Sequence, residues 1–139
     1  MAFIVDASMT LAWHFEDEAT PETEKLFART VGELIVVPRH WFFEVANGAL
    51  MGERRRRATP QQTAFFRHRM ADFEVEVDGQ DDGAALVFDR VLPLARAHHL
   101  TIYDAAYLEL AERRGLPLAT LAAELAAAGR SVGIEILGA

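Results

Sequence analysis

Three acidic residues in separate parts of the chain have the surroundings of groups that do chemistry. Asp6 directly follows an apolar run at residues 2–5. Glu44 lies within Trp-Phe-Phe-Glu-Val-Ala, and Asp104 lies within Ile-Tyr-Asp-Ala-Ala. Carboxylates held close together repel one another unless a cation lies between them, and Mg²⁺ or Mn²⁺ takes such oxygen ligands. A cation held in this way activates water and neutralises charge on a phosphate under attack, so the set predicts metal-assisted hydrolysis.

Two of these acids also have an ordinary structural interpretation. Asp6, or Ser8 two residues later, suits the N-cap of the helix that follows. Thr101 and Asp104 have the spacing of a capping box, and an acid at the third helical position suits the helix dipole. Taken one at a time, neither acid distinguishes a cap from a ligand. The combination of acids from different elements favours the ligand interpretation.

Glu44 lies on one face of a predicted helix with Asn47 and Gly48, three and four residues later. The alternative to a functional role is a solvated stripe on an amphipathic helix. Apolar residues on both sides of this stretch favour the functional role, because an unpaired carboxylate is costly to bury.

Short apolar runs alternate along the chain with segments of helical periodicity. Strands are predicted at residues 2–5, 34–37, 73–77, 116–121 and 132–137. Helices are predicted from Ser8 to Phe15, 21–30, 40–56, 59–70, from Asp81 or Asp82 to Leu94 with a break at Pro93, 101–114 capped by Gly115, and 122–128 closed by Gly129. The alternation predicts an α/β fold with a mostly parallel sheet, helices on both faces and residues 73–77 at an edge. Ligands of such sheets gather beyond the carboxyl ends of the strands, where Asp6 is placed.

The helix at 40–56 carries most of its large apolar residues near its start. The positions predicted to face the core are Trp41, Val45, Ala49 and Leu50. The neighbouring aromatic residues are predicted to be core or dimer contacts rather than base-stacking platforms: Phe42 and Phe43, with Trp13 and Phe15 of the first helix.

The chain of 139 residues contains no Cys and has a formal charge of −7. The absence of Cys excludes thiolate metal sites, disulfide scaffolds and thiol enzymes, and the charge taken alone argues against nucleic-acid binding. The charge is uneven, because residues 39–69 hold seven Arg against Glu44 and Glu53. Most of these arginines form one basic run, Arg54, Arg55, Arg56 and Arg57. Two interpretations of the run stay open: a solvated helix end, and a contact with RNA phosphates or an acidic partner.

Missing motifs exclude several other classes of α/β enzyme. The chain has no Gly-x-Gly-x-x-Gly, no Gly-Lys-Ser/Thr phosphate loop and no Gly-x-Ser-x-Gly nucleophile elbow. The apolar runs are too short to cross a bilayer, and the first residues lack the basic start and apolar stretch of a signal peptide. We therefore expect one domain over residues 1–139, located in the cytoplasm and not in a membrane.

Four segments in register resemble the PIN-domain family and, within it, the VapC-type toxins of bacterial toxin–antitoxin modules. They are Phe-Ile-Val-Asp-Ala-Ser at 3–8, Pro38 with Phe-Glu-Val-Ala-Asn-Gly-Ala-Leu at 43–50, Tyr-Asp-Ala-Ala-Tyr-Leu-Glu-Leu-Ala at 103–111, and Leu-Pro-Leu-Ala-Thr-Leu at 116–121. No single segment is specific, but together they span nearly the whole chain in the order that the family has.

The resemblance implies a PIN-like three-layer sandwich and a Mg²⁺- or Mn²⁺-dependent endoribonuclease that hydrolyses RNA with a metal-activated water. It implies a homodimer, held inactive by a small VapB-like antitoxin, which alone would link it to operator DNA. By family resemblance the catalytic metal ligands are Asp6, Glu44 and Asp104. The residues implied to support or line the site are Ser8, Asn47 and Thr120.

One position departs from the family pattern. A fourth acid commonly follows the Thr of the fourth strand by two residues, and here that position is Ala122. Glu124, two residues further along a helix, is expected to face elsewhere. Three interpretations stay open: three acids suffice, Ala122 is an inactivating change, or the chain is a weak or inactive PIN-like module that acts by binding its antitoxin and operator complex.

Overall fold

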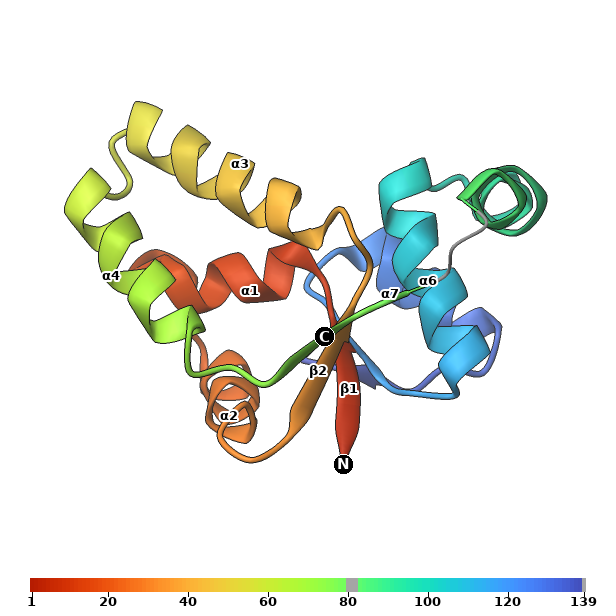
Figure 1. Ribbon diagram of the computed structural model, residues 1–139, viewed down its shortest axis with the longest axis horizontal. Helices are drawn as coiled ribbons and strands as arrows, with labels where there is room; N and C mark the ends of the chain where they lie inside the picture. The colour runs from red at the N-terminus through yellow and green to blue at the C-terminus, as the bar shows by residue number, and fades with distance from the viewer. Residues whose placement is uncertain (80–82, 139) are drawn as a thin grey trace.

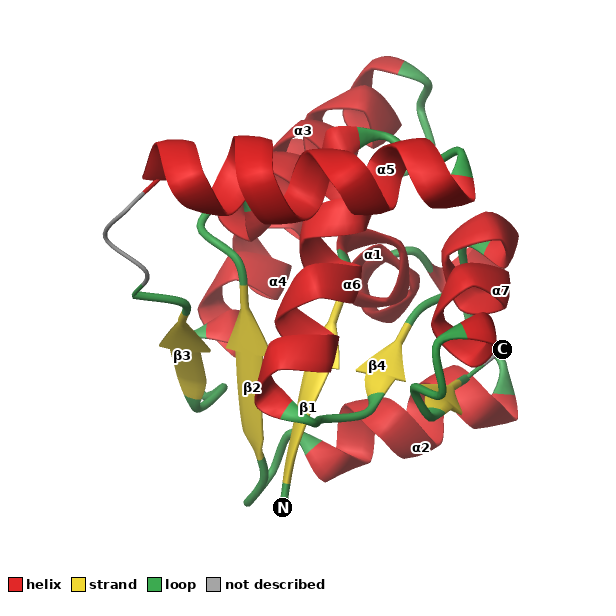
Figure 2. Cartoon of the chain, turned by 90° about the vertical axis from the view of Figure 1, so that its right-hand side faces the viewer, coloured by secondary structure: helices red, strands yellow, loops and turns green. Residues whose placement is uncertain are grey.

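The computed structural model describes residues 1–79 and 83–138, and its centre is a five-stranded sheet in which every pairing is parallel (Figures 1 and 2). The strand order is β3-β2-β1-β4-β5. The strands are β1 (Ala2–Val5), β2 (Leu34–Val37), β3 (Val75–Val77), β4 (Leu118–Ala119) and β5 (Ile136–Leu137). The predictions of an α/β fold and of an edge strand within residues 73–77 are confirmed, and the strand itself covers Val75–Val77.

Helices connect the strands and cover both faces of the sheet. They are α1 (Ala7–His14), α2 (Pro21–Arg29), α3 (Trp41–Arg54), α4 (Pro60–Met70), α5 (Leu92–His98), α6 (Ile102–Arg114) and α7 (Ala123–Ser131), with a 3₁₀ turn at Glu16–Glu18 and a π-helix at Ala85–Val91. In Figure 1, α1 to α4 lie on one side of the sheet, and α6 and α7 lie on the other. Among the described residues no helix is long and apolar enough to span a membrane.

The two central strands are buried on both faces, which explains their unbroken apolar sequences. Phe3, Ile4 and Val5 of β1 are fully buried, as are the residues at 35–37 of β2. The neighbouring strand register pairs Val5 with Ala119. Since β2 and β3 extend the sheet to one side of β1 and β4 and β5 extend it to the other, the strand order reverses between β1 and β4. Such a reversal opens a crevice at the carboxyl ends of the two strands.

Local sequence signals account for several helix boundaries. Thr20 and Thr59 each form a capping box at the start of a helix with Pro at its beginning, α2 and α4 respectively. Gly115 ends α6 in the left-handed conformation, with φ +63°. The break expected at Pro93 takes the form of a change from the π-helix to α5, because proline lacks an N–H and crowds the preceding turn. The start predicted at Asp81 or Asp82 lies outside the described residues.

Two strands are much shorter than predicted. The segments 116–121 and 132–137 contribute only Leu118–Ala119 and Ile136–Leu137 to the sheet. The reason is that neighbouring backbone groups bond to helix ends instead: Leu116 N–H donates to Ala111 O (3.2 Å), and Ile134 N–H donates to Gly129 O (2.8 Å).

Two predictions about single residues in helices are wrong. Gly129 does not close the last helix but lies inside α7, where a Cβ would come within 2.6 Å of Ile136 Cδ1. Leu50 is 40% exposed and is not a core residue. Phe42 and Phe43 are 47% and 81% exposed, so they are not core residues either, and a dimer contact stays a prediction for them. Only one stripe of α3 is buried, on the side that packs against α1, and Trp41, Val45 and Ala49 occupy it.

Candidate functional site

A pocket of about 390 Å³ lies at the carboxyl edge of the sheet, beside the reversal between β1 and β4. All three predicted acids line it. One wall comes from the start of α1, another from the first half of α3, and the rest from α6 and the residue before α7. The lining residues are Asp6, Ala7, Ser8, Leu11, Glu44, Asn47, Gly48, Asp104, Tyr107 and Ala122. Segments far apart in the sequence therefore bring three carboxylates to one cavity.

Asp6 is both the N-cap of α1 and a member of the pocket. Its Oδ1 accepts from Met9 N–H (2.9 Å), so the cap is Asp6 and not Ser8. Burial, which leaves the residue 2% exposed, raises the pKa of its carboxyl to about 6, although hydrogen bonds from Thr120, Met9 and Ser8 oppose the shift. A buried carboxyl that ionises reluctantly gains from a nearby cation.

Ser8 and Thr120 hold the Asp6 carboxylate from two directions. Ser8 Oγ donates to Asp6 at 2.7 Å from Oδ1 and 2.9 Å from Oδ2, and Thr120 Oγ1 donates to Oδ2 at 2.5 Å. Each hydroxyl also accepts a backbone N–H, from Leu121 (2.9 Å) and Ala122 (3.0 Å) respectively. The loop after β4 is thereby tied to the residue after β1.

Glu44 lies in the first turn of α3 and is partly buried. Its Oε1 accepts a hydrogen bond from Tyr107 Oη (2.7 Å) and lies 3.2 Å from His40 Nε2. Burial alone would raise the pKa of this carboxyl, but the contacts with His40 and Tyr107 outweigh it, so the pKa lies below its ordinary value. Glu44 therefore stays ionised near neutral pH.

His40 and Tyr107 are functional candidates that the sequence interpretation missed. The signals available were the four-residue spacing from His40 to Glu44 and the three-residue spacing from Asp104 to Tyr107, each of which places two side chains on one helical face. Tyr107 is fully buried, and its hydroxyl reaches Glu44 across the space between α6 and α3. That second contact is not encoded in any local spacing.

Asp104 occupies the third position of α6, and its backbone N–H donates to Thr101 Oγ1 (3.1 Å), as predicted for a capped helix. Burial raises the pKa of its carboxyl, and the negative charges of Glu44 and Glu124 raise it further. Glu124 is exposed and is not among the residues that line the pocket, although its charge acts on Asp104 through space. Two neighbouring negative charges thus disfavour ionisation of Asp104 in the absence of a cation, which favours cation binding.

The donor chemistry fits a divalent cation, but the side chains do not form a closed cage. In residues 1–79 and 83–138, no group of three acidic or histidine side chains is arranged to hold an ion by itself. Mg²⁺ commonly keeps several waters and binds through one or two carboxylates together with substrate phosphates. An open pocket with Asp6 and Asp104 as oxygen donors and Glu44 close by agrees with this mode.

Two further predicted positions line the pocket without touching the Asp6 carboxylate. Asn47 is exposed on the turn of α3 after Glu44. Ala122 lies at the N-cap of α7, where no side chain caps the helix. The pocket wall at this point is apolar, because Ala122 takes the place of a fourth acid.

The basic run lies at the opposite end of α3 from Glu44, about 15 Å away at 1.5 Å per residue. Arg57 forms ion pairs with Asp17 (3.0 Å) and Glu18 (2.5 Å), and its guanidinium lies 4.1 Å from the centre of the Phe15 ring. Arg54, Arg55 and Arg56 are exposed beside it. The structure therefore does not bring the basic run to the pocket.

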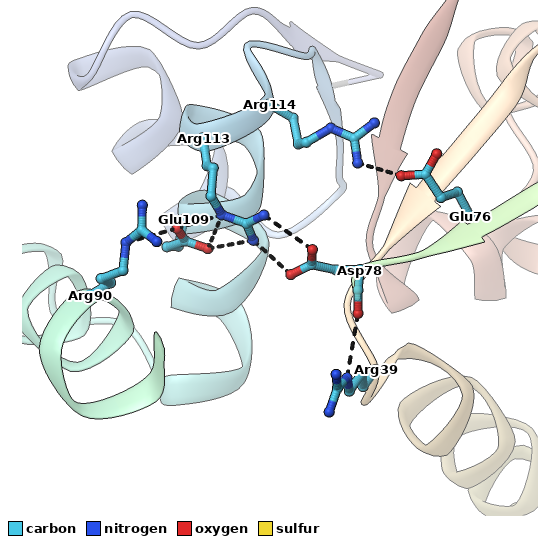
Figure 3. A network of polar contacts seen from close by, with 7 residues as sticks. All are labelled: Arg39, Glu76, Asp78, Arg90, Glu109, Arg113 and Arg114. Atoms are coloured by element: carbon cyan, nitrogen blue, oxygen red, sulfur yellow. Dashed lines mark hydrogen bonds and ion pairs between the residues drawn. The ribbon is translucent and has the colours of Figure 1, made fainter. Parts of the chain in front are cut away.

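The end of α6 remote from Asp104 is anchored by buried ion pairs (Figure 3). The guanidinium of Arg113 donates to both oxygens of Asp78, at 3.1 Å and 2.6 Å, and lies 3.0 Å from Glu109 Oε1. Asp78 follows β3, and Arg90 of the π-helix lies 3.6 Å from Glu109. This network joins α6 to the sheet and so helps to set the position of the helix that carries Asp104.

Comparisons with known proteins agree with this architecture. The family model described as PIN domain matches residues 3–130. The structure is similar to that of PAE2754 from Pyrobaculum aerophilum, with a TM-score of 0.65 and 26% identity over 98% of this chain and 83% of the other. No curated protein is matched in sequence.

Two solved structures with lower identity have the same fold. One is Mycobacterium tuberculosis VapC20, described as a sarcin–ricin loop cleaving toxin, with a TM-score of 0.64 and 17% identity over 91% of this chain and 95% of that one. The other is a toxin–antitoxin complex from Klebsiella pneumoniae, with a TM-score of 0.57 and 15% identity over 90% of each chain.

Proposed function

Because the chain belongs to the PIN domain family, we propose that it is a VapC-type toxin, a Mg²⁺- or Mn²⁺-dependent endoribonuclease. The observation that carries the proposal is the convergence of Asp6, Glu44 and Asp104, from three elements, on one pocket at the carboxyl edge of the sheet. Carboxylates in this number at such a place are suited to hydrolysis of a phosphodiester. The likeness to VapC20 supports RNA as the substrate.

The residues that line the pocket have different roles in the proposed reaction. Asp6 and Asp104 would offer carboxylate oxygens, and Ser8 and Thr120 keep Asp6 in one orientation through their hydroxyls. A bound Mg²⁺ or Mn²⁺ would activate water and neutralise charge on the phosphate. Glu44, which stays ionised, adds negative charge to the same pocket. The expected products carry a 5′-phosphate and a 3′-hydroxyl, since the 3′-oxygen leaves.

The proposed partners follow from the toxin assignment. The Klebsiella pneumoniae toxin–antitoxin complex supports a small VapB-like antitoxin that inhibits this chain. Operator DNA would be reached only through that antitoxin, as the toxin assignment implies. We further propose a homodimer in the cytoplasm, where the RNA substrate is found.

A second function is favoured by Ala122. Where the family commonly has a fourth acid, the pocket wall is a methyl group. The alternative proposal is therefore a PIN-like module with little or no catalytic activity, which acts by binding its antitoxin and operator complex. The two proposals differ in one measurable property, which is RNA cleavage in the presence of a divalent cation.

The decisive experiment compares the chain with Asp6→Ala on a labelled RNA containing a sarcin–ricin stem-loop and on total RNA. We expect cleavage with Mn²⁺ or Mg²⁺, none in EDTA, and none by Asp6→Ala. Equal cleavage in EDTA would contradict the metal-dependent proposal. An inert chain that becomes active as Ala122→Asp would support the second function, and inertness of both proteins together with no cation binding would refute the nuclease proposal.

A further inference from the structure

The carboxylate of Glu44 is held through one of its two oxygens. Oε1 accepts from Tyr107 Oη at 2.7 Å and lies 3.2 Å from His40 Nε2. The two donors approach from different elements, since Tyr107 belongs to α6 and His40 immediately precedes α3. Both are conformationally restricted: Tyr107 is fully buried, and the His40 ring packs against the Tyr107 ring with centroids 5.1 Å apart.

The surroundings of His40 determine which of its nitrogens carries hydrogen. His40 Nε2 lies 3.1 Å from the backbone carbonyl oxygen of Tyr103 as well as 3.2 Å from Glu44 Oε1. A carbonyl oxygen and an ionised carboxylate are both acceptors only. Nε2 must therefore be protonated, and the imidazole joins the start of α3 to the start of α6, on either side of the pocket.

From these contacts we infer that His40 and Tyr107 are positioning residues for Glu44, which hold it by Oε1 so that Oε2 is the oxygen presented to a cation in the pocket. This inference rests on the proposed function. Hydrogen bonds to a metal-binding carboxylate fix its orientation, and their loss typically weakens metal affinity by about 10- to 100-fold. Glu44 needs such support, because its flexible side chain is only partly buried and has water as an alternative partner.

The alternative is that Glu44 serves only as the hydrogen-bond acceptor that the buried Tyr107 hydroxyl requires. A purely structural role of this kind would change stability and leave cation affinity alone. The two roles are separated by measuring Mn²⁺ affinity by calorimetry, without RNA, together with melting temperature in EDTA.

The test uses Tyr107→Phe, which removes only the hydroxyl, and His40→Ala. Each should weaken Mn²⁺ binding by about tenfold or more. His40→Gln should recover part of the loss, since its amide can donate from near the position of Nε2. In a Glu44→Ala background the same changes should have no further effect on Mn²⁺ affinity, because both residues act through Glu44.

Tyr103→Phe is the matched control. It also removes one tyrosine hydroxyl from α6, but this residue is 59% exposed and contributes its backbone carbonyl to His40, so Mn²⁺ affinity should match the unaltered chain. If Tyr107→Phe and His40→Ala bind Mn²⁺ like the unaltered chain while Glu44→Ala binds it weakly, the inference fails and the proposed function stands. If the unaltered chain binds no Mn²⁺, both fail.

Discussion

The hydroxyl of Thr120 donates a hydrogen bond to Asp6 Oδ2 across 2.5 Å, and so joins the residue after β4 to the residue after β1. These strands flank the point where the strand order reverses, and Asp6 N–H also donates to Ala119 O at 3.1 Å. The pairing of the two strands therefore delivers Thr120 to the Asp6 carboxylate. The hydrogen bond is fully buried on the Thr120 side, which makes it sensitive to substitution.

Replacing Thr120 by Val should destabilise the protein by about 1–3 kcal/mol, because Asp6 and the Ala122 N–H each lose a buried partner. The free energy of unfolding, measured by urea denaturation in EDTA, tests this. Thr120→Ser keeps the hydroxyl and should retain most of the stability. Equal losses in the two variants would contradict a dominant role of the hydroxyl, since Thr120→Ser loses only the methyl group.

The stability of the cation-free protein should depend on the ionisation of Asp6. Burial raises the pKa of this carboxyl to about 6 from an ordinary value of 3.8, so the folded state binds the proton more tightly than the unfolded state. The stabilisation that the folded state gains by keeping Asp6 protonated is therefore lost as pH rises from about 4 through 6. Asp6→Asn should gain about 2 kcal/mol relative to the unaltered chain between pH 4 and pH 8 in EDTA. A constant difference between the two proteins would contradict the shift.

Asp104→Asn should weaken Mn²⁺ binding without lowering the melting temperature in EDTA. The cap of α6 uses the backbone N–H of residue 104, which Asn keeps, and loss of the charge relieves repulsion from Glu44 and Glu124. Calorimetric titration and thermal denaturation measure the two effects. A large drop in melting temperature with unchanged Mn²⁺ affinity would instead assign this carboxylate to helix capping.

Ala122→Asp should raise both stability and Mn²⁺-dependent RNA cleavage. Residue 122 is the N-cap of α7 and lines the pocket, so Asp can cap the helix and add a fourth carboxylate. A cap is worth about 1 kcal/mol. Ala122→Asn is the control, since it caps the helix without charge and should raise only the melting temperature. If it raises cleavage equally, the gain comes from stability and not from the acid.

The two arginines at the end of α6 should differ strongly in how much their ion pairs contribute to stability. Arg113→Met removes the guanidinium shared by the buried Asp78 and Glu109 and leaves Glu109 with the more exposed Arg90, which should cost about 3 kcal/mol. Arg114 pairs with Glu76 at the surface, and Arg114→Met should cost less than about 1 kcal/mol. Urea denaturation of both variants measures this. Similar losses of stability in the two variants would show that burial does not determine how much these ion pairs contribute.

Much of the fold could be predicted from the sequence, because its elements depend on local patterns. The apolar run before Asp6 indicates a buried strand, and the Thr-Pro pairs before α2 and α4 indicate helix starts. Each signal is complete within a few residues, since strand and helix periodicity and capping act over one or two turns. The choice of Asp6, Glu44 and Asp104 rested instead on their combination from different elements and on the resemblance to the PIN-domain family.

Only the tertiary structure decided how these acids are held. The bond from Thr120 to Asp6 spans 114 positions and depends on the pairing of β1 with β4. The bond from Tyr107 to Glu44 spans 63 positions and depends on how α3 and α6 face each other across the pocket. No periodicity in the sequence reports such contacts, because each joins two elements whose separation is set by packing on the sheet. The same reason explains why Glu124 acts on Asp104 despite its displaced position along α7.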